Sequence, residues 1–382
     1  MSEIAPSTTD RCLTDLDQLG PLVERLGVRS IFLVADGGAY RFSGAEAKLA
    51  PLLARVPTVV FSAFEPNPKF EQVLEGLAEF RRCGADLLLA IGGGTAIDIA
   101  KLIGVLAATP AEPLAVARGE HPPARPTCPL AVAPTTSGSG SEATQFAVVY
   151  VDGAKYSVDH PHLLPTYCIL DPSLTAKLPA SITAHCGLDA FSQAIESIWS
   201  VRATERSLRD AFEGARLAFA HLHNAVHAPT PVAREAMCRA SHLAGRAINE
   251  TRTTASHAIS YAITTGYGVP HGHAVALTLG AMLLHNAGVI DDDVNDPRGA
   301  AHVQGRIRQI LGLLGCETAE QGNQAIQGFV RSLGCEVRLS AVGVRTPEEL
   351  RAIVNKVNLE RLKNNPRQLT GGQLLSLLES IG

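Results

Sequence analysis

The chain has 382 residues, of which 46% are hydrophobic and 18% are charged, and its formal net charge is −4. This length favours two domains, and this composition excludes a disordered chain. The small negative charge gives no electrostatic footprint for nucleic-acid binding.

The first part of the chain alternates short apolar runs with helical patterns. Such alternation predicts a parallel sheet that is covered by helices. Strands are predicted at residues 29–35, 57–61, 86–91, 130–134, 146–152 and 167–170, helices at 70–82 and 95–107, and a turn at 36–38.

Helical periodicity dominates after about residue 179, with breaks at residues 229–231, 266–270 and 297–299. No strong strand pattern follows that point. The sequence therefore predicts an α/β dinucleotide-binding domain at 1–179 and an all-α domain that carries metal and substrate at 180–382.

The cysteines and the start of the chain indicate a reducing compartment. The eight cysteines contain no CxxC pair, and we expect free thiols. The N-terminus lacks the basic and apolar stretches of a signal peptide, and no run approaches the roughly 18 apolar residues of a membrane span. We expect a soluble cytoplasmic protein without a membrane partner.

A run of glycines, Gly92-Gly93-Gly94-Thr95, joins a predicted buried strand to a predicted helix. Glycines let the backbone approach a ligand, and the free N–H groups and dipole of the following helix favour a pyrophosphate. The run is not the GxGxxG of a standard Rossmann fingerprint, so an ordinary glycine turn is the alternative.

A second loop, PTTSGSGSE at residues 134–142, follows the next strand and is rich in hydroxyls and glycines. Because ligands of α/β sheets bind beyond the carboxyl ends of strands, two such loops favour a dinucleotide over a solvated loop. Asp36, at the end of the first strand, is the candidate for the adenosine ribose and would favour NAD over NADP. The alternative is a turn aspartate.

Candidate metal ligands lie in the second half of the chain. Asp189 and Gln193 are four residues apart and share one helical face, and Asp189 has apolar neighbours that predict burial. His257 and His271 come from two later helical segments. Oxygen and nitrogen ligands of this kind suit one divalent ion, although buried, hydrogen-bonded histidines are a common alternative.

Several motifs resemble, in order and spacing, the iron-containing (group III) alcohol dehydrogenase family. They are GGGTAIDIAK, PTTSGSGSE, DPSLTAKLP, GLDAFSQAIES and PHGHA. The resemblance implies an α/β dinucleotide-binding domain followed by a helical metal domain, an architecture shared with dehydroquinate synthase. It also implies NAD(P)H-linked reduction of an aldehyde with one divalent metal, Fe²⁺ or Zn²⁺.

Residue by residue, the resemblance makes Asp189, His257 and His271 metal ligands. The same resemblance, together with the glycine run, gives the cofactor contacts Asp36, Asn67, Gly92, Gly93, Gly94, Thr95, Asp98, Thr135, Thr136, Ser139 and Lys155.

The chain departs from the family pattern at two positions. Gln193 stands where a fourth ligand, a histidine, is usual, so we expect a more loosely held metal or an open coordination position. Tyr261 stands where many members have another histidine, and it either donates a proton to the developing alkoxide or packs there.

Within the family, these departures resemble phosphonoacetaldehyde reductases. The same resemblance extends over the stretch TRTTASHAISYAITTGYGVPHGHAVALTLG. The implied substrate is a small anionic carbonyl compound, phosphonoacetaldehyde, which would become 2-hydroxyethylphosphonate. A dianion needs a cationic partner, for which Arg252 is the first candidate. A surface or structurally paired arginine is the alternative.

Other functions stay open at this stage. Within the family, the substrate is alternatively phosphonopyruvate or a simple alcohol or polyol. A sugar-phosphate cyclase of the dehydroquinate synthase type shares the architecture but consumes no NADH. A binding protein without catalysis is disfavoured, because the metal and cofactor motifs are both present. We expect a homodimer, as is usual in the family.

Overall fold

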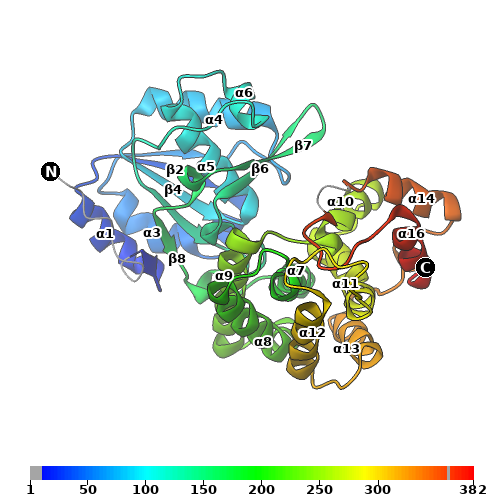
Figure 1. Ribbon diagram of the computed structural model, residues 1–382. Coiled ribbons are helices and arrows are strands. Elements are labelled where there is room, and N and C mark those ends of the chain that lie inside the picture. Colours follow the sequence, from blue (N-terminus) through cyan, green and yellow to red (C-terminus); the bar gives the residue numbers. More distant parts are fainter. Residues whose placement is uncertain (1–10, 359–361) are drawn as a thin grey trace. The chain divides into compact units, whose positions relative to one another are not determined.

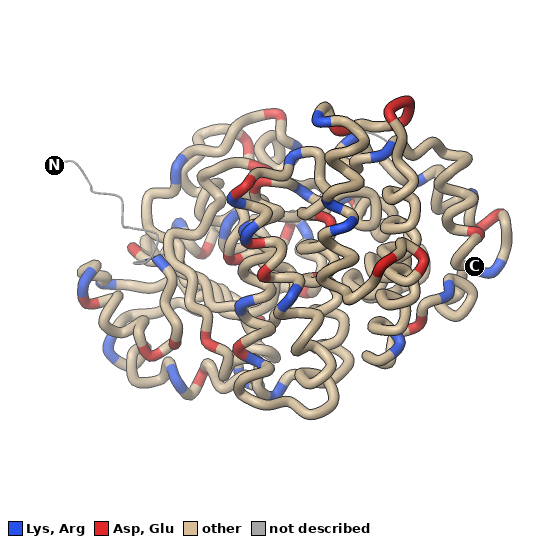
Figure 2. Tube along the Cα trace, turned by 60° about the horizontal axis from the view of Figure 1, so that its bottom comes forward, with Lys and Arg blue, Asp and Glu red and all other residues tan. Residues whose placement is uncertain are grey.

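The computed structural model describes residues 11–358 and 362–382, and it separates into two compact units, Met1–Leu178 and Pro179–Gly382 (Figure 1). The first residues, which bear on the signal-peptide prediction, lie outside the described part. Acidic and basic residues are interspersed along the chain (Figure 2). Among the described residues, we find no helix with the length and apolarity needed to span a membrane.

The first unit is built on a six-stranded sheet in the order β1-β8-β5-β4-β2-β3, and all neighbouring strands run parallel. β3, which follows β2 along the chain, lies on one side of β2, whereas β4 and the later strands β5 and β8 lie on its other side. The direction in which the chain adds strands therefore reverses between β2 and β4. The strands are β1 (Cys12–Leu13), β2 (Ile31–Ala35), β3 (Thr58–Phe61), β4 (Leu87–Gly92), β5 (Leu130–Pro134) and β8 (Tyr167–Ile169).

Helices cover both faces of this sheet (Figure 1). Phe32 and Val34 of β2 enter one core with α4 and α5, and Ile31 and Leu33 enter the other with α1 and α3. Burial on both faces explains why the strands are continuous apolar runs. The helices are α1 (Leu19–Leu26), α2 (Gly37–Phe42), α3 (Ala45–Leu53), α4 (Phe70–Cys83), α5 (Gly94–Ala108) and α6 (Pro113–Ala117).

Three local features differ from the sequence prediction. The predicted turn at 36–38 is the start of α2. The strand predicted at 146–152 is β6 (Phe146–Val151), which pairs antiparallel with β7 (Ala154–Asp159) in a separate two-stranded sheet. Neither β7 nor the two-residue β1 was predicted, because β7 has only one buried residue and no continuous apolar run, and β1 is too short to show a period.

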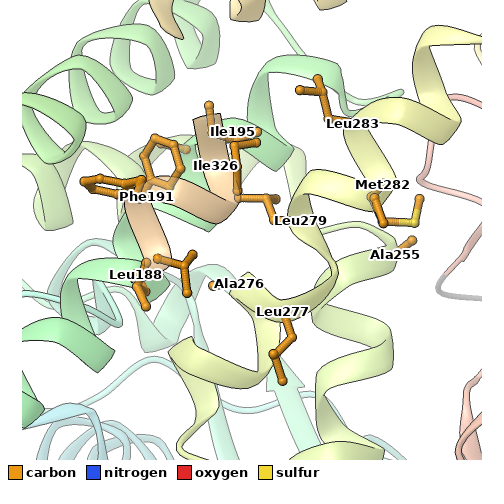
Figure 3. Close-up of a cluster of buried hydrophobic side chains, with 14 of the residues drawn as sticks. Leu188, Phe191, Ile195, Ala255, Ala276, Leu277, Leu279, Met282, Leu283 and Ile326 are labelled. Carbon is orange, nitrogen blue, oxygen red and sulfur yellow. The ribbon is translucent and has the colours of Figure 1, made fainter. Parts of the chain in front are cut away.

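The second unit is helical around one core. Side chains of α7 and α11 gather there, including Phe191, Ile195 and Leu279, with Ile326 from α13 (Figure 3). The helices are α7 (Ala180–Trp199), α8 (Glu205–His227), α9 (Pro231–Thr251), α10 (Ala255–Tyr267), α11 (His271–Ala287), α12 (Ala300–Leu314), α13 (Ala319–Ser332), α14 (Pro347–Lys356) and α16 (Gly371–Ser380).

Short 3₁₀ turns connect several elements. They are η1 (Leu16–Gln18), η2 (Ser141–Ala143), η3 (Pro161–Leu163), η4 (Pro172–Thr175) and η5 (Ser340–Val342). The predicted helix breaks coincide with the gaps before α9, α11 and α12. The predicted fold class, a parallel α/β domain followed by a helical domain, is confirmed.

Candidate cofactor loops and metal centre

The two glycine-rich loops of the first unit meet at the carboxyl ends of β4 and β5. The Thr135 N–H donates to the Gly92 carbonyl at 2.9 Å. A Cβ added to Gly94 would lie 3.0 Å from Ser139 Oγ, and one added to Gly93 would lie 3.6 Å from Thr136 Oγ1. The loops therefore pack against each other, most tightly at Gly94, and α5 begins at this junction.

Asp36 lies beside the first of these loops. It follows β2 and caps α2, and its Oδ1 accepts the N–H groups of Gly38 and Ala39 at 3.1 and 3.2 Å. A Cβ on Gly92 would lie 3.3 Å from the Asp36 Cβ. Asp36 and the glycine run thus flank the reversal of strand order between β2 and β4, which is where parallel α/β sheets bind dinucleotides.

Two buried hydroxyls in the second loop fit a bound cofactor. Thr135 Oγ1 and Ser137 Oγ are buried and have no hydrogen-bond partner among the described residues. An unsatisfied buried hydroxyl costs about 1–3 kcal/mol, so a ligand that bonds to both would remove that cost. The hydroxyls and the side-chain-free glycine cradle suit a nicotinamide dinucleotide. Sequence reasoning did not single out Ser137, although it lies within the quoted motif.

Asp98 is engaged within the protein. Its Oδ1 accepts the Ser141 hydroxyl at 2.6 Å and its Oδ2 accepts the Val148 N–H at 2.9 Å. The buried Lys101 ammonium donates to Ser141 Oγ at 3.0 Å and to the Thr144 carbonyl at 2.8 Å. Burial lowers the pKa of Lys101 to about 8, against the opposing charge of Asp98. Together Asp98 and Lys101 fasten the second loop to α5 and β6.

The remaining predicted cofactor residues lie in three places. Thr95 is in the first turn of α5. Asn67 is exposed and has a left-handed φ of 64°. Lys155 lies on β7 opposite Tyr150 of β6, and the Tyr150 N–H donates to the Pro68 carbonyl at 2.8 Å. The segment with Asn67 therefore pairs with the β6–β7 hairpin.

In the second unit, Asp189 of α7, His257 of α10 and His271 of α11 converge. Their ligand atoms all lie within 4.8 Å of one another. The Nε2 atoms of His257 and His271 are 3.3 and 3.9 Å from Asp189 Oδ1. Asp189 and His257 are buried, whereas the His271 side chain is 38% exposed, so a small molecule has access from the His271 side.

A close approach of two helices creates this geometry. A Cβ added to Gly272, beside His271, would lie 2.0 Å from the His185 carbonyl oxygen and 2.8 Å from the Asp189 Cβ. Only glycine lets the start of α11 press against α7 in this way. Gly272 therefore places His271 beside Asp189.

The donor set fits a divalent cation. Ligand atoms about 2.0–2.2 Å from one ion lie roughly 3.0–3.5 Å apart, close to the separations seen here. One carboxylate and two imidazoles match the oxygen and nitrogen donors that Fe²⁺ and Zn²⁺ accept. These three residues would hold the ion and leave at least one position for substrate.

Glu196 of α7 orients His257 and was missed by sequence reasoning. Its fully buried carboxylate lies 2.5 Å from His257 Nδ1 and also accepts from the Thr254 hydroxyl at 2.8 Å and the Ser256 N–H at 2.8 Å. Burial opposes charge on His257, but Glu196 and Asp189 outweigh it and raise the pKa of His257 to about 10. With Nδ1–H bound to Glu196, Nε2 faces Asp189 as a metal ligand requires. Glu196 is seven residues after Asp189, and this spacing could have revealed it.

Gln193 and Tyr261 lie next to this cluster. Gln193 is buried and hydrogen-bonds to Asp189. Burial raises the pKa of the Asp189 carboxyl, but hydrogen bonds from His257 and Gln193 and the charge of His271 lower it overall. The Tyr261 ring stacks on His271, with ring centroids 5.6 Å apart. Gln193 and Tyr261 thus each contact one of the candidate metal ligands.

Arg252 occupies the connection between α9 and α10. Its backbone φ of 59° and ψ of 175° belong to a region that only glycine adopts readily. Its Nη1 donates to the carbonyls of Ile248 and Asn249, so the side chain lies over the end of α9. The Asn364 amide holds the turn by donating to the Thr251 and Thr253 carbonyls at 2.8 and 2.9 Å. The geometry gives Arg252 a capping role at the end of α9.

Comparisons with known proteins agree with this architecture. The model of iron-containing alcohol dehydrogenase matches residues 13–172, and that of the C-terminal part of the Fe-containing alcohol dehydrogenase family matches residues 183–382. A phosphonoacetaldehyde reductase of Streptomyces viridochromogenes is 34% identical over 84% of this chain and 82% of its own. A 1,3-propanediol dehydrogenase of Klebsiella pneumoniae is 32% identical over 86% and 84%.

Among solved structures, a sulfoacetaldehyde reductase from Bifidobacterium kashiwanohense in complex with NAD⁺ superposes with a TM-score of 0.87. It is 28% identical, and the match covers 97% of this chain and 96% of that one.

Proposed function

The chain belongs to the iron-containing alcohol dehydrogenase family, and we propose that within it the chain reduces phosphonoacetaldehyde to 2-hydroxyethylphosphonate. Members of this family carry out NAD(P)-dependent oxidoreduction of alcohols and aldehydes with a divalent metal. The observation that carries the finer proposal is the 34% identity to a phosphonoacetaldehyde reductase over most of both chains. The similarity to a sulfoacetaldehyde reductase adds a second relative named for an aldehyde with an anionic group.

The side chains described above have separate tasks in this reaction. Asp189, His257 and His271 would hold the metal, which would supply Lewis-acid stabilisation of the carbonyl oxygen, and a bound nicotinamide would supply the hydride. Glu196 keeps His257 in the tautomer that presents Nε2. Tyr261, stacked on His271, is our candidate proton donor, and replacement with phenylalanine would lower kcat if its hydroxyl takes part.

Recognition of the anionic group is assigned to Arg252 as a proposal. Its strained backbone is fixed by Asn364, and strain of this kind, which costs about 1–3 kcal/mol, clusters at functional sites. A phosphonate would require the guanidinium to exchange its contacts with the end of α9 for contacts with the ligand. Arg252→Gly is the informative variant, because glycine tolerates the backbone angles while the whole side chain, guanidinium included, is removed.

For the cofactor we propose NAD(H) over NADP(H). Asp36 places a carboxylate beside the glycine run, and a carboxylate there repels a 2′-phosphate. Asp36→Ser keeps a residue that can cap α2 but removes the charge. NADPH should then become a better substrate relative to NADH, and an unchanged preference would place selectivity elsewhere. The metal, Fe²⁺ or Zn²⁺, and the homodimer stay predictions.

A simple alcohol or diol is the second candidate substrate, favoured by the 32% identity to a 1,3-propanediol dehydrogenase. The deciding experiment measures NADH oxidation with phosphonoacetaldehyde, sulfoacetaldehyde and propanal, after loading with Fe²⁺ or Zn²⁺. We expect a strong preference for phosphonoacetaldehyde, lost in Arg252→Gly through a raised KM while propanal turnover is kept. Equal or better use of propanal by the wild type would remove the phosphonate proposal and leave the alcohol dehydrogenase.

A further inference from the structure

A second group of metal-ligating side chains lies in the helical unit, apart from the candidate catalytic ligands. His185 of α7, His273 of α11 and Cys335, which follows α13, each offer a ligand atom, and these atoms lie within 4.8 Å of one another. We propose that His185, His273 and Cys335 bind a second divalent cation, preferentially Zn²⁺, which clips the segment after α13 to α7 and α11.

The contact at Gly272 prepares this site together with the first one. His185 precedes Asp189 by one helical turn, and His271 and His273 flank Gly272. Because Gly272 brings the two helices into backbone contact at His185, one imidazole reaches Asp189 and the other reaches His185. The rings of His185 and His273 have centroids 5.8 Å apart, close to the 5.5 Å between His257 and His271.

The tautomer of His273 leaves one ring nitrogen for a metal. Its Nε2 lies 2.7 Å from the Glu336 carbonyl oxygen, and a carbonyl can only accept, so the proton is on Nε2. The lone pair is then on Nδ1. A backbone carbonyl that fixes the tautomer of a ligand histidine is a usual second partner in metal sites. The carbonyl belongs to the residue after Cys335, so one segment both supplies the thiol and orients the imidazole.

The donor set selects the ion. Two imidazoles and one thiolate are donors that Zn²⁺ prefers over Mg²⁺ or Ca²⁺. With Zn–N and Zn–S bonds of about 2.0–2.3 Å, tetrahedral ligand atoms lie roughly 3.3–3.8 Å apart. The atoms here lie within 4.8 Å of one another, so they need to close by at most about 1.5 Å. Binding releases the Cys335 thiol proton to solvent. His185 is only half-buried, which leaves water as the fourth ligand.

Cobalt substitution distinguishes the two sites, since only the second contains sulfur. The full-length, metal-stripped protein is titrated with Co²⁺ and its absorption recorded. We expect two equivalents of bound Co²⁺ and a sulfur-to-cobalt charge-transfer band. Cys335→Ser should lose the band and one equivalent, whereas Cys316→Ser, another cysteine of this unit, should keep both.

Two further variants secure the interpretation. His271→Ala should lose catalytic metal but keep the charge-transfer band, which shows that the sulfur-containing site is independent of the catalytic one. His185→Gln alters a half-buried side chain, so it tests the site if Cys335→Ser fails to fold, and it should weaken the band. Absence of the band in wild-type protein at saturating Co²⁺, or its persistence in Cys335→Ser, would overturn the proposal.

Discussion

Replacing Glu196 with glutamine should weaken metal binding about 10–100-fold, the usual effect of changing the partner of a ligand histidine. The carboxylate contacts donors with both oxygens. Oε2 faces His257 Nδ1 and the Thr254 N–H, and Oε1 faces the Thr254 hydroxyl and the Ser256 N–H. An amide group cannot accept at both ends, so one set of donors must lose its acceptor.

The two orientations of the glutamine differ in cost. If its nitrogen replaces Oε1, the Ser256 N–H loses its partner, and so does the weaker contact from the His257 N–H at 3.4 Å. At about 1–3 kcal/mol for each buried donor, this is the more expensive choice. If the nitrogen replaces Oε2, the Thr254 N–H loses its acceptor, and the nitrogen donates to His257 Nδ1, which moves the imidazole proton to Nε2. His257 then has no lone pair at Nε2 for the ion.

The assay is competition with a chelator for Fe²⁺ or Zn²⁺, together with urea unfolding of the metal-free protein. We expect affinity to fall by about 1.4–2.7 kcal/mol, which corresponds to the 10–100-fold loss, and metal-free stability to fall by about 1–3 kcal/mol. Glu213→Gln, a change of the same kind on α8, should alter neither. Metal affinity within twofold of wild type would refute the role given to Glu196.

Three further outcomes are expected. Gly94→Ala should raise the KM for NADH roughly tenfold, because the added Cβ would lie 3.0 Å from Ser139 Oγ. Gly312→Ala adds a Cβ where no atom lies within 4 Å, so it should leave this KM unchanged. Steady-state kinetics with varied NADH measures both values. Burial raises the pKa of the Asp171 carboxyl, but Lys48 and backbone donors lower it overall, so the charge of Asp171 stabilises the fold above pH about 4 and this stabilisation is lost at lower pH. Asp171→Asn should therefore lower the free energy of unfolding by about 1–3 kcal/mol at pH 7 and by less at pH 3, as measured by urea unfolding. Equal losses at the two pH values would contradict this role. Gln193→His should slow metal loss to a chelator, and unchanged loss would place Gln193 away from the ion.

Much of the fold could be predicted because its signals are local. Strands such as β2 and β4, buried on both faces, are continuous apolar runs, and glycine or proline marks the helix breaks in the second unit. β7 escaped prediction because its stability comes from pairing with β6 rather than from its own apolar pattern. The helix at Asp36 was mistaken for a turn because Gly-Gly is a poor helix start, and the side chain of Asp36 compensates by capping it.

In the candidate site, too, local sequence signals could be predicted from the sequence and long-range contacts could not. Residue type and motif identified Asp189, His257 and His271, and the structure brings them together, but the contacts that support them span long separations. Glu196 reaches His257 over 61 residues, and Asn364 reaches Thr251 over 113. Pairings of this range have no period in the sequence. The same holds for Asp98, whose carboxylate is used by Ser141 and Val148 on elements that only the fold makes adjacent.

The order of events during maturation follows from where the ligands lie in the chain. Asp189 and His257 are separated by 68 residues, which include all of α8 and α9. Closing a loop of this length costs conformational entropy before the intervening helices have packed, so we expect the ligands to gather only as the helical unit folds. We therefore expect the helical unit to fold around its apolar core without the ion, and the ion to bind a set of ligands that the folded helices already hold together.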